Sequence, residues 1–488
     1  LDYRPFEDRK TYDLTGKLDA SIGKAVDVTF SGTYYKIENQ FTPDNWRVFN
    51  SHNNPTSNDE RYRANVRLRH RLGGASTSAD GGQKGSFIQN AAYVLQFGYE
   101  KNKFSVGDPR HKDNLFDYGY IGKYDLTWEP TVPTVIDTII NDTVYIVPQH
   151  VDYTRIFSGY TLGDKNPVLT RYILNGEDND NFNDFDVLNG SIPTNLSNVW
   201  SNHHTNVGAV YNLNRKRDSD IYTFSATSSF ELVPSGSGEN RHSIQFGILY
   251  EQRTNRGYDI SPRGLWTIAR GHANEHIDGQ GLDSSIVLSV LDTVTTVVNQ
   301  FTGETWTIPT QVPIFAPNIQ VTSTDNQFYK NLRDKLGVPL NQYVNVDGLS
   351  PDQLSLDMFS ARELNDDNNT IGLNYWGYDY LGELIDGITF EDFFTTRDAN
   401  GIRTFPVAAD RPNYQAAYVQ DKFKFKDVIF RVGVRVDRFD ANTKVLRDPY
   451  SLYDIAGAAD FHDQHTGQTR PGNIGDDGSF EFTYEEIC

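Results

Sequence analysis

The sequence lacks the features on which disulfide frameworks, thiolate metal sites and helical membrane spans depend. Its 488 residues include one cysteine, Cys488, so a disulfide framework and a Cys-rich metal site are excluded. Mean hydropathy is −0.57, and no run approaches the ~18 apolar residues of a membrane-spanning helix. A helical membrane protein is therefore excluded. A membrane barrel is not, because its strands are apolar on one face only.

Basic residues are also few relative to acidic ones. The chain has 45 Lys and Arg against 65 Asp and Glu, for a net charge of −20, so we expect no nucleic-acid partner. Aromatic residues, in contrast, make up 13% of the chain, with 28 Tyr and 29 Phe. This enrichment favours strands and an aromatic girdle at a membrane interface.

The regular feature that is present is a two-residue alternation, clearest in "YDLTGKLDASIGKAVDVTFSGTY", residues 12–34. Period two is typical of strands with one apolar and one wet face. Each arm is long enough to cross a bilayer, which takes about 9 to 11 tilted residues. We therefore predict a membrane hairpin in which the apolar side chains Leu14, Leu18, Val28 and Phe30 face lipid, whereas Asp13, Asp19 and Asp27 face a lumen.

The same alternation recurs along the chain and predicts about ten long strands. The further runs are 60–72, 87–99, 118–128, 205–213, 220–232, 242–253, 413–425 and 428–440. We predict short turns at Lys24, at 100–102 and at 426–427, and long loops at 37–58, 129–203 and 254–412. Short turns at one end and long loops at the other are typical of outer-membrane barrels.

Local patterns within the long loops predict further elements. Residues 134–148 and 286–300 are expected to form hairpin arms. Residues 350–365 are expected to form a short helix, with Ser350 as its cap and Pro351 at its first position.

The most prominent charge pattern is a set of arginines on one face of two predicted strands. These candidate lumen-facing residues are Arg61, Arg63, Arg67, Arg69, Arg71, Arg431 and Arg435. They could attract an anionic ligand or pair with the carboxylates of a plug domain. The alternative is a solvated inner wall in which they pair with Asp13, Asp19 or Asp27 on neighbouring strands.

Two motifs could bind metal. "HANEH", residues 272–276, fits the H-x-x-E-H pattern of zinc peptidases, but its glycine-rich surroundings favour a loop. "EDNDNFNDFD", residues 177–186, could hold a structural Ca²⁺ in a surface loop, or could be a solvated acidic turn; its candidate ligands are Asp178, Asp180, Asp184 and Asp186. No nucleophile, nucleotide or Cys/His zinc motif is present, so we expect no enzyme and no other cofactor.

One segment supports a family resemblance. "NYQAAYVQDKFKFKDVIFRVGVRVDRFDANTKVLRDPYSLYDI", residues 413–455, resembles TonB-dependent outer-membrane receptors, in particular the Bacteroidota subgroup with an N-terminal carboxypeptidase-regulatory-like domain. Shorter stretches are similar to the same family: "RPFEDRKTYDLTGKLD", "FGILYEQRTNRGYDI" at 246–260, and "LWTIARGHANEHI" at 265–277. The last stretch makes "HANEH" part of a family loop.

The resemblance implies an all-β protein that forms part of a 22-stranded transmembrane antiparallel barrel with long extracellular loops. We expect residues 1–488 to be a fragment of the barrel domain, without the signal peptide, TonB box and plug. The implied function is TonB-coupled uptake of an unknown ligand across the bacterial outer membrane. The implied partners are outer-membrane lipid, TonB through the missing N-terminal part, and a surface lipoprotein.

Two alternatives remain open at this point. One is a barrel that does not transport but displays its loops in a cell-surface complex. The other is a soluble all-β surface protein or glycan-binding protein, although runs of about ten residues are longer than the strands of sandwiches usually are.

Overall fold

A computed structural model describes most of the chain. The described residues are 5–43, 46, 48–72, 88–131, 134–140, 143–148, 152–176, 188–190, 207–233, 241–322, 324–366, 368–425 and 427–445. The chain divides into two compact units, Leu1–Ala441 and Asn442–Cys488. Every element described below belongs to the first unit, which therefore contains all the sites considered.

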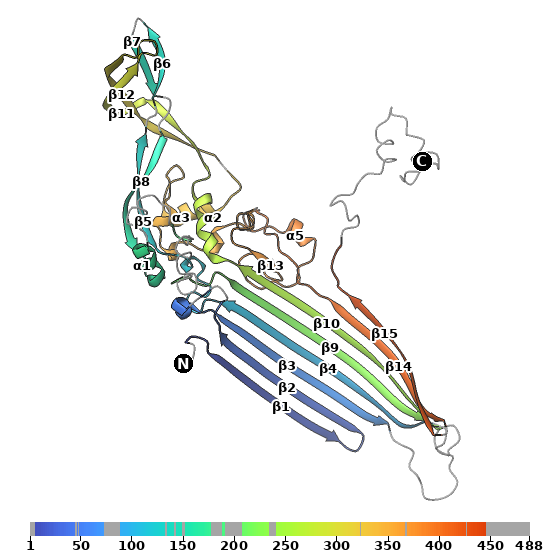
Figure 1. The fold of residues 1–488 in the computed structure, drawn as a ribbon. Coiled ribbons are helices and arrows are strands. Elements are labelled where there is room, and N and C mark those ends of the chain that lie inside the picture. Colours follow the sequence, from blue (N-terminus) through green and yellow to red (C-terminus); the bar gives the residue numbers. More distant parts are fainter. Residues whose placement is uncertain are drawn as a thin grey trace, which may run out of the picture. The chain divides into compact units, whose positions relative to one another are not determined.

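The first unit is built around a nine-stranded antiparallel sheet. Eight of its strands follow one another in sequence order across the sheet, and the short β13 pairs with β10 (Figure 1). The eight strands are β1 (Arg9–Ile22), β2 (Val26–Gln40), β3 (Thr56–Leu72), β4 (Ile88–Gly107), β9 (Asn214–Leu232), β10 (His242–Ile260), β14 (Asn413–Phe425) and β15 (Val428–Asp440), and β13 is Asn374–Trp376. The predicted all-β antiparallel class is thus confirmed.

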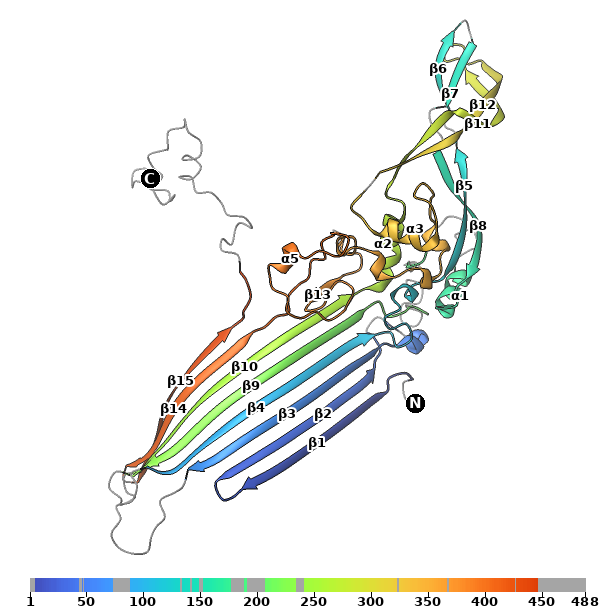
Figure 2. The same ribbon diagram turned by 180° about the vertical axis from the view of Figure 1, so that it is seen from behind.

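The connections between these strands differ greatly at the two ends of the sheet. The segments 41–55, 108–213 and 261–412 all leave the same end, whereas 23–25, 73–87, 233–241 and 426–427 join strands at the other (Figures 1 and 2). The uneven connections that the sequence predicts are therefore present. The strands reach further into the predicted loops, however, because β2 continues to Gln40 and β10 to Ile260.

The opening hairpin forms as predicted. Gly23 lies at the turn with φ 65°, a left-handed conformation that glycine adopts without a steric penalty. The register pairs Leu18 with Phe30 and Ala20 with Val28, so the apolar side chains of both arms share one face. Alternation alone therefore places the two faces of β1 and β2 correctly.

The long segments contain their own elements. Three two-stranded sheets pair β5 with β8, β6 with β7, and β11 with β12. These strands are β5 (Gly122–Thr131), β6 (Thr134–Ile140), β7 (Thr143–Pro148), β8 (Asp152–Leu162), β11 (Ile277–Val298) and β12 (Thr305–Val321). The predicted hairpin arms at 134–148 and 286–300 are confirmed by β6, β7 and β11.

In the described ranges, five short α-helices accompany them: α1 (Pro167–Gly176), α2 (Leu265–Ala273), α3 (Phe328–Leu336), α4 (Ala361–Leu364) and α5 (Asp392–Thr395). Within the described ranges, none of the helices combines the length and apolar character needed to cross a membrane.

The apolar core lies in these loop segments. Trp266 on α2 is fully buried, and its ring contacts Phe116 edge-to-face with centroids 5.6 Å apart. Its indole Nε1 donates a hydrogen bond to the Phe116 carbonyl, 3.1 Å away. Phe359 stacks on Phe328 of α3 at 4.0 Å. The loop-bearing end of the sheet thus carries a packed cluster built from segments far apart in sequence.

Two strands predicted within the segment 108–213 are corrected: 205–213 is not a strand in its described part, and 118–128 is a strand only from Gly122, where β5 begins. Tyr118 and Tyr120 precede β5 and are buried in the core, where Tyr120 stacks on Trp266 with centroids 5.7 Å apart. Residues 209–213 are not a strand either; the carbonyl of Ala209 accepts a hydrogen bond from Asn50 Nδ2, 3.0 Å away. In both cases alternating aromatic or apolar residues pack into a core instead of lining a sheet.

The predicted turn at 100–102 is also wrong, because β4 runs through it without interruption. Glu100 binds Arg63 at 2.5 Å on one face of the sheet. Lys101 binds Asp218 at 3.0 Å on the other face. The charged run that suggested a turn is therefore a strand segment whose charges are paired on both faces.

The predicted helix over 350–365 is broken into three pieces. They are 3₁₀ helices at Pro351–Gln353 and Leu356–Met358, followed by α4. Ser350 caps the first as predicted, with its backbone N–H donating to Gln353 Oε1 at 2.9 Å. Ser360 adopts an extended conformation and caps α4, because a serine side chain competes for backbone groups and starts a new helix.

Candidate functional site

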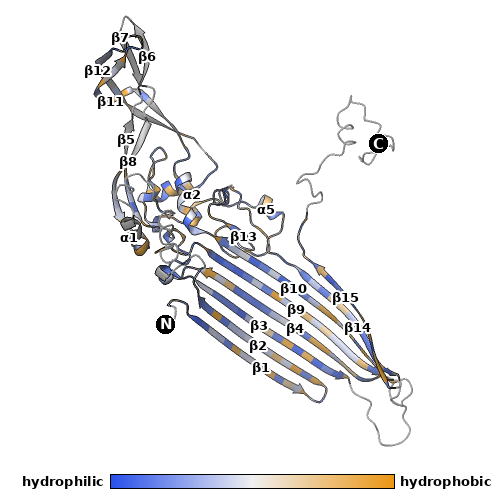
Figure 3. Cartoon of the chain, in the orientation of Figure 1, coloured by the Kyte–Doolittle hydropathy of each residue, from blue (hydrophilic) through white to orange (hydrophobic). Residues whose placement is uncertain are grey.

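One face of the main sheet is apolar over most of its area. The register makes its side chains direct neighbours from strand to strand, as in the row Leu18, Phe30, Val66, Phe97, Phe224 and Tyr250. Large apolar side chains on this face are exposed, including Leu14 at 66% and Val436 at 66%. Figure 3 shows the alternation along each strand. A contiguous apolar surface of this extent marks an interaction with lipid or with another protein.

A row of tyrosines borders this apolar face on the side of the long loops. Six consecutive strands of the sheet each place a tyrosine as the last aromatic or aliphatic residue before polar side chains begin: Tyr12, Tyr34, Tyr62, Tyr99, Tyr222 and Tyr250. Tyr34 and Tyr62 have ring centroids 5.1 Å apart. Tyrosine suits a boundary between apolar and wet surroundings because its ring is apolar and its hydroxyl is polar. We call these six residues the tyrosine border.

The tyrosine border runs obliquely across the strands. Tyr34 pairs with Tyr62 and Tyr99 with Tyr222 at equal height, but Tyr12 pairs with Lys36, Tyr62 with Lys101 and Tyr222 with Gln252. In each of these last three pairs, the tyrosine of the second strand lies two residues nearer the short turns than the residue that pairs with the first tyrosine. The border therefore falls by about six residues over five steps, which at ~3.3 Å per residue and ~4.8 Å between strands is an angle of about 40°.

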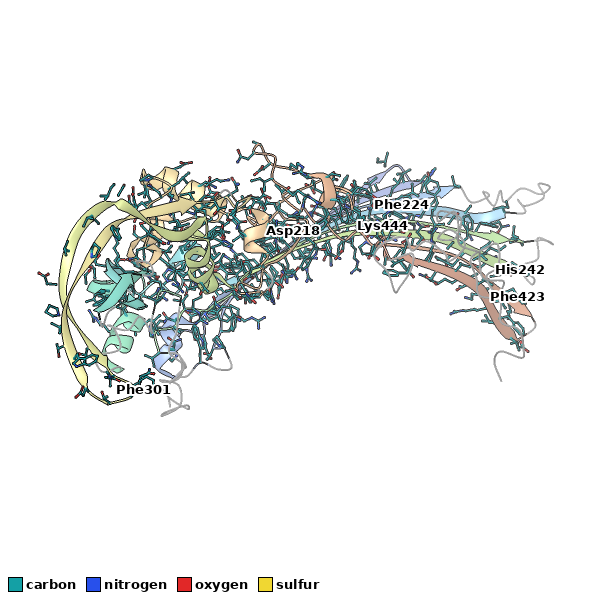
Figure 4. All side chains as sticks on the ribbon, turned by 90° about the horizontal axis from the view of Figure 1, so that it is seen from above. Asp218, Phe224, His242, Phe301, Phe423 and Lys444 are labelled. Atoms are coloured by element: carbon teal, nitrogen blue, oxygen red, sulfur yellow. The ribbon has the colours of Figure 1, made fainter. Side chains whose placement is uncertain are left out.

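Charged side chains follow on the same face, beyond the tyrosine border. Lys36 binds Glu38 at 2.7 Å and Glu60 at 3.4 Å. A second cluster joins Lys101, Asp218, Asp220 and Arg256, with Arg256 bound to Asp220 at 2.5 Å. On β9, Figure 4 labels Asp218, which belongs to the second charged cluster, and Phe224, which belongs to the apolar face. Along the five strands β1, β2, β3, β4 and β9 the surface thus changes from apolar to tyrosine to charged, and on β10 it changes from apolar to tyrosine to polar.

The opposite face of the sheet is polar and carries the predicted arginines. Arg63 and Arg61 reach Glu100 at 2.5 and 3.6 Å, and Arg71 binds Asp27 at 2.6 Å. Of the three predicted carboxylate partners, Asp27 is therefore used, whereas Asp19 binds Lys17 on its own strand at 2.8 Å. Glu100, the partner of Arg61 and Arg63, was not predicted because it lies in the segment 100–102, which was predicted to be a turn.

The other arginines on this face differ in their partners. Arg435 binds Asp437 at 3.0 Å. Arg67, Arg69 and Arg431 have no ion pair within the described ranges. Arg67 and Arg69 alternate on β3 and are both exposed, so two guanidinium groups are available to an anion on this face.

The "HANEH" motif is structural in the described part of the chain. His272 lies near the end of α2, and its Nδ1 is 2.6 Å from Glu275 Oε2. Burial disfavours the charged form of His272, but the hydrogen bond and charge of Glu275 prevail and raise its pKa. Burial lowers the pKa of His276. His276 stacks on Tyr329 with centroids 4.0 Å apart and bonds the Leu340 carbonyl.

A second acidic residue, Glu363, lies near His272 and Glu275, but both of its oxygens already accept hydrogen bonds. Glu363 Oε1 accepts hydrogen bonds from the backbone N–H of Phe328 at 2.9 Å and of Gln327 at 3.1 Å. Its Oε2 accepts from Ser360 N at 2.6 Å. Glu363 thus caps α3 and α4, which explains its burial without a metal ion.

The predicted calcium ligands, Asp178, Asp180, Asp184 and Asp186, lie outside the described residues. The aromatic composition predicted a girdle at an interface but not its residues, and the six members of the tyrosine border were not named from the sequence, although a signal for them exists. Five of its members lie two residues from a charged side chain at the end of an apolar stripe, as in Tyr34 with Lys36, and Tyr99 with Lys101.

Comparisons with known proteins add no assignment. No family model matches the chain, and neither the curated proteins nor the solved structures give a match. The function must therefore be inferred from the chain's own residues and register.

Proposed function

We propose that the main sheet is part of the wall of a transmembrane β-barrel in the bacterial outer membrane. The chain would then serve as a receptor for TonB-coupled uptake of a ligand, as in the TonB-dependent receptors that its sequence resembles. The observation that carries this proposal is the oblique course of the tyrosine border.

The slope of the border has a simple explanation in a membrane. Strands of outer-membrane barrels tilt by about 35–45° from the barrel axis. Residues at equal depth in the bilayer then lie on a line that crosses the register at the same angle. The slope of about 40° makes the tyrosine border level with the membrane surface. A soluble sheet has no reason to keep aromatic residues on such a line.

The width of the apolar face agrees with this orientation. On β2 the face extends from Tyr34 to Val26, and at ~3.3 Å per residue and a tilt of ~40° this length covers roughly 20 to 25 Å of membrane thickness. The apolar band of outer-membrane barrels is about 25 Å tall. The charged clusters of Lys36 and Arg256 would then lie at the depth of the lipid headgroups.

The polar face would line the lumen. Arg67 and Arg69, without ion-pair partners within the described ranges, would meet an anionic ligand or a plug carboxylate there. The edge strands β1 and β15 end the described sheet. Because lipid leaves no unpaired edge in a membrane sheet, closure would require β1 and β15 to pair with each other or with further strands.

Membrane insertion can be tested on the full-length protein by detergent partition and by gel migration. We expect it in the detergent phase and expect its migration to change on heating, as for folded outer-membrane barrels. A protein that stays in the aqueous phase and migrates identically before and after heating would rule out the barrel. Uptake is tested separately, since cells lacking TonB should fail to accumulate a ligand that wild-type cells take up.

A further inference from the structure

A cavity of about 430 Å³ lies where the loop-side ends of β9 and β10 meet two loop segments. Asn214, Lys216 and Tyr258 contribute from the two strands. The first loop segment contributes the short turn of 3₁₀ helix Leu115–Asp117, and the second contributes residues 351–357. Leu381 and Glu383 complete the lining. Neither the sequence patterns nor the proposed function accounts for this cavity.

The floor of the cavity is apolar and rigid. Leu115, Phe116 and Leu354 line it and are at most 9% exposed. Phe116 is held by Trp266, which contacts its ring and binds its carbonyl. A preformed aromatic and aliphatic floor favours a ligand with an apolar body.

The rim of the cavity is acidic and only partly neutralised. Asp113 binds Lys216 at 3.3 Å, and Asp352 lies 3.9 Å from Lys165. Asp357 and Glu383 have no basic partner within the described part of the chain, and both residues are exposed. An anionic ligand would meet like charges at this rim, whereas a cationic ligand would neutralise them.

A buried hydroxyl adds an independent sign of a ligand. Tyr258 lines the cavity and is 2% exposed, yet its hydroxyl has no hydrogen-bond partner among the described residues. A side chain at Gly382 would come within 3.1 Å of the Tyr258 ring, so the turn that carries Leu381 and Glu383 lies against it. Leaving a buried hydroxyl unpaired is unfavourable, and a ligand that bonds to it would remove this penalty.

We propose that this cavity binds an organic cation with a primary ammonium group on an apolar body. The apolar body would lie on Phe116 and Leu354, and the ammonium would bind the carboxylates of Asp357 and Glu383 and the hydroxyl oxygen of Tyr258. A bare metal ion would make no use of the apolar floor. The inference does not depend on membrane insertion, because it uses only residues of the loop-side end.

Matched probes test the charge and the apolar body together. Calorimetric titration of the purified chain would compare 4-phenylbutylammonium with 4-phenylbutanoate and 4-phenylbutan-1-ol. We expect the ammonium to bind at least about tenfold more tightly than either analogue, and less tightly as NaCl rises from about 50 to 500 mM. Equal affinity for all three probes would overturn the proposal.

Variants locate the binding to the cavity. The double variant Asp357→Asn with Glu383→Gln should weaken ammonium binding by about three- to tenfold, the range expected for two partly exposed ion pairs. The control Glu304→Gln with Glu391→Gln makes the same change in net charge at two exposed residues outside the cavity, and should leave binding unchanged. Equal effects of the two double variants would mean only diffuse attraction to an acidic protein.

Tyr258→Phe separates binding from folding. Because the hydroxyl has no partner in the described structure, its removal should not lower the thermal unfolding midpoint of the ligand-free chain, while ammonium affinity should fall. A lower midpoint with unchanged affinity would assign the hydroxyl a structural role and contradict the proposal. A negative result in these binding tests would not bear on membrane insertion, and a negative detergent-partition result would not bear on ligand binding in the cavity.

Discussion

Tyr99 on β4 and Tyr222 on β9 are direct register partners with ring centroids 5.1 Å apart. The whole segment 108–213 lies between their strands in sequence. The apolar face therefore continues without a step across the point where the chain leaves the sheet for its first long loop segment. This continuity makes the tyrosine border a property of the assembled sheet and not of any single hairpin.

A charge on the apolar face should disrupt membrane assembly much more than one on the polar face. Val28 pairs with Ala20 and Leu68 on the apolar face, whereas its neighbour Thr29 pairs with Asp19 and Arg67 on the other. We expect Val28→Arg to cost about 2–4 kcal/mol of folding free energy in lipid, and Thr29→Arg less than about 1 kcal/mol. Heat-modifiable migration after refolding into phospholipid vesicles measures the difference. Equal tolerance at both positions would reverse the assignment of the faces.

The slope of the tyrosine border can be measured with spin labels. Gly16 and Gln252 lie on one register row, through Gly32, Ala64, Tyr99 and Tyr222. With a tilt of about 40°, the six-residue fall of the border places Gly16 roughly 15 Å deeper in the bilayer than Gln252. After Cys488→Ser, nitroxides at Gly16→Cys and Gln252→Cys should differ in accessibility to oxygen and to a nickel chelate. Equal accessibilities at the two positions would mean that the strands are not tilted in the membrane, or that the sheet does not lie in a membrane.

Loss of a core aromatic should unfold the loop segments without affecting the sheet surface. Trp266 is fully buried, whereas Trp306 on β12 is 46% exposed. Trp266→Ala should cost about 3–5 kcal/mol, because it removes a large buried side chain and leaves a cavity. Trp306→Ala should cost less than about 1 kcal/mol. Near-ultraviolet circular dichroism during denaturant unfolding would compare them; similar midpoints for the two variants would contradict the described core.

The pair His272 and Glu275 should stabilise the loop segments at mildly acidic pH. Because the pKa of His272 is raised in the folded state, its contribution is complete below the unfolded pKa of about 6.5 and is lost as pH rises through the folded value. The difference in thermal midpoint between wild type and His272→Gln should thus be larger at pH 5.5 than at pH 9. In a Glu275→Gln background the difference should no longer be larger at pH 5.5, because burial then disfavours the charged imidazole without the carboxylate that offsets it. A difference that grows with pH would contradict the predicted sign.

Alternation in the sequence was sufficient to predict the strands that have one exposed apolar face. For β1, β2 and β15, apolar and polar side chains alternate over most of the strand, and period two favours this assignment. The same alternation was misleading near Tyr118 and Tyr120. The backbone turns there, and both side chains lie in the core.

The sites were harder to predict because they depend on register and on contacts between distant segments. The height of Tyr222 relative to Tyr99 follows from the pairing of β4 with β9, which no local pattern specifies. The unpartnered hydroxyl of Tyr258 becomes visible only when the turn at Gly382 is placed against it. Glu363 could be recognised as a cap of α4 from Ser360, but not as a cap of α3.

The eight long strands of the main sheet follow one another across it in sequence order. The segments 108–213 and 261–412 therefore connect strands that are already neighbours in the sheet. Doubling the length of such a closed segment adds only about 0.6 kcal/mol of closure entropy. A longer segment therefore costs little in closure entropy, but Phe116 of the first segment packs on Trp266 of the second. The two segments would therefore have to be exchanged together for the same sheet to present a new ligand surface.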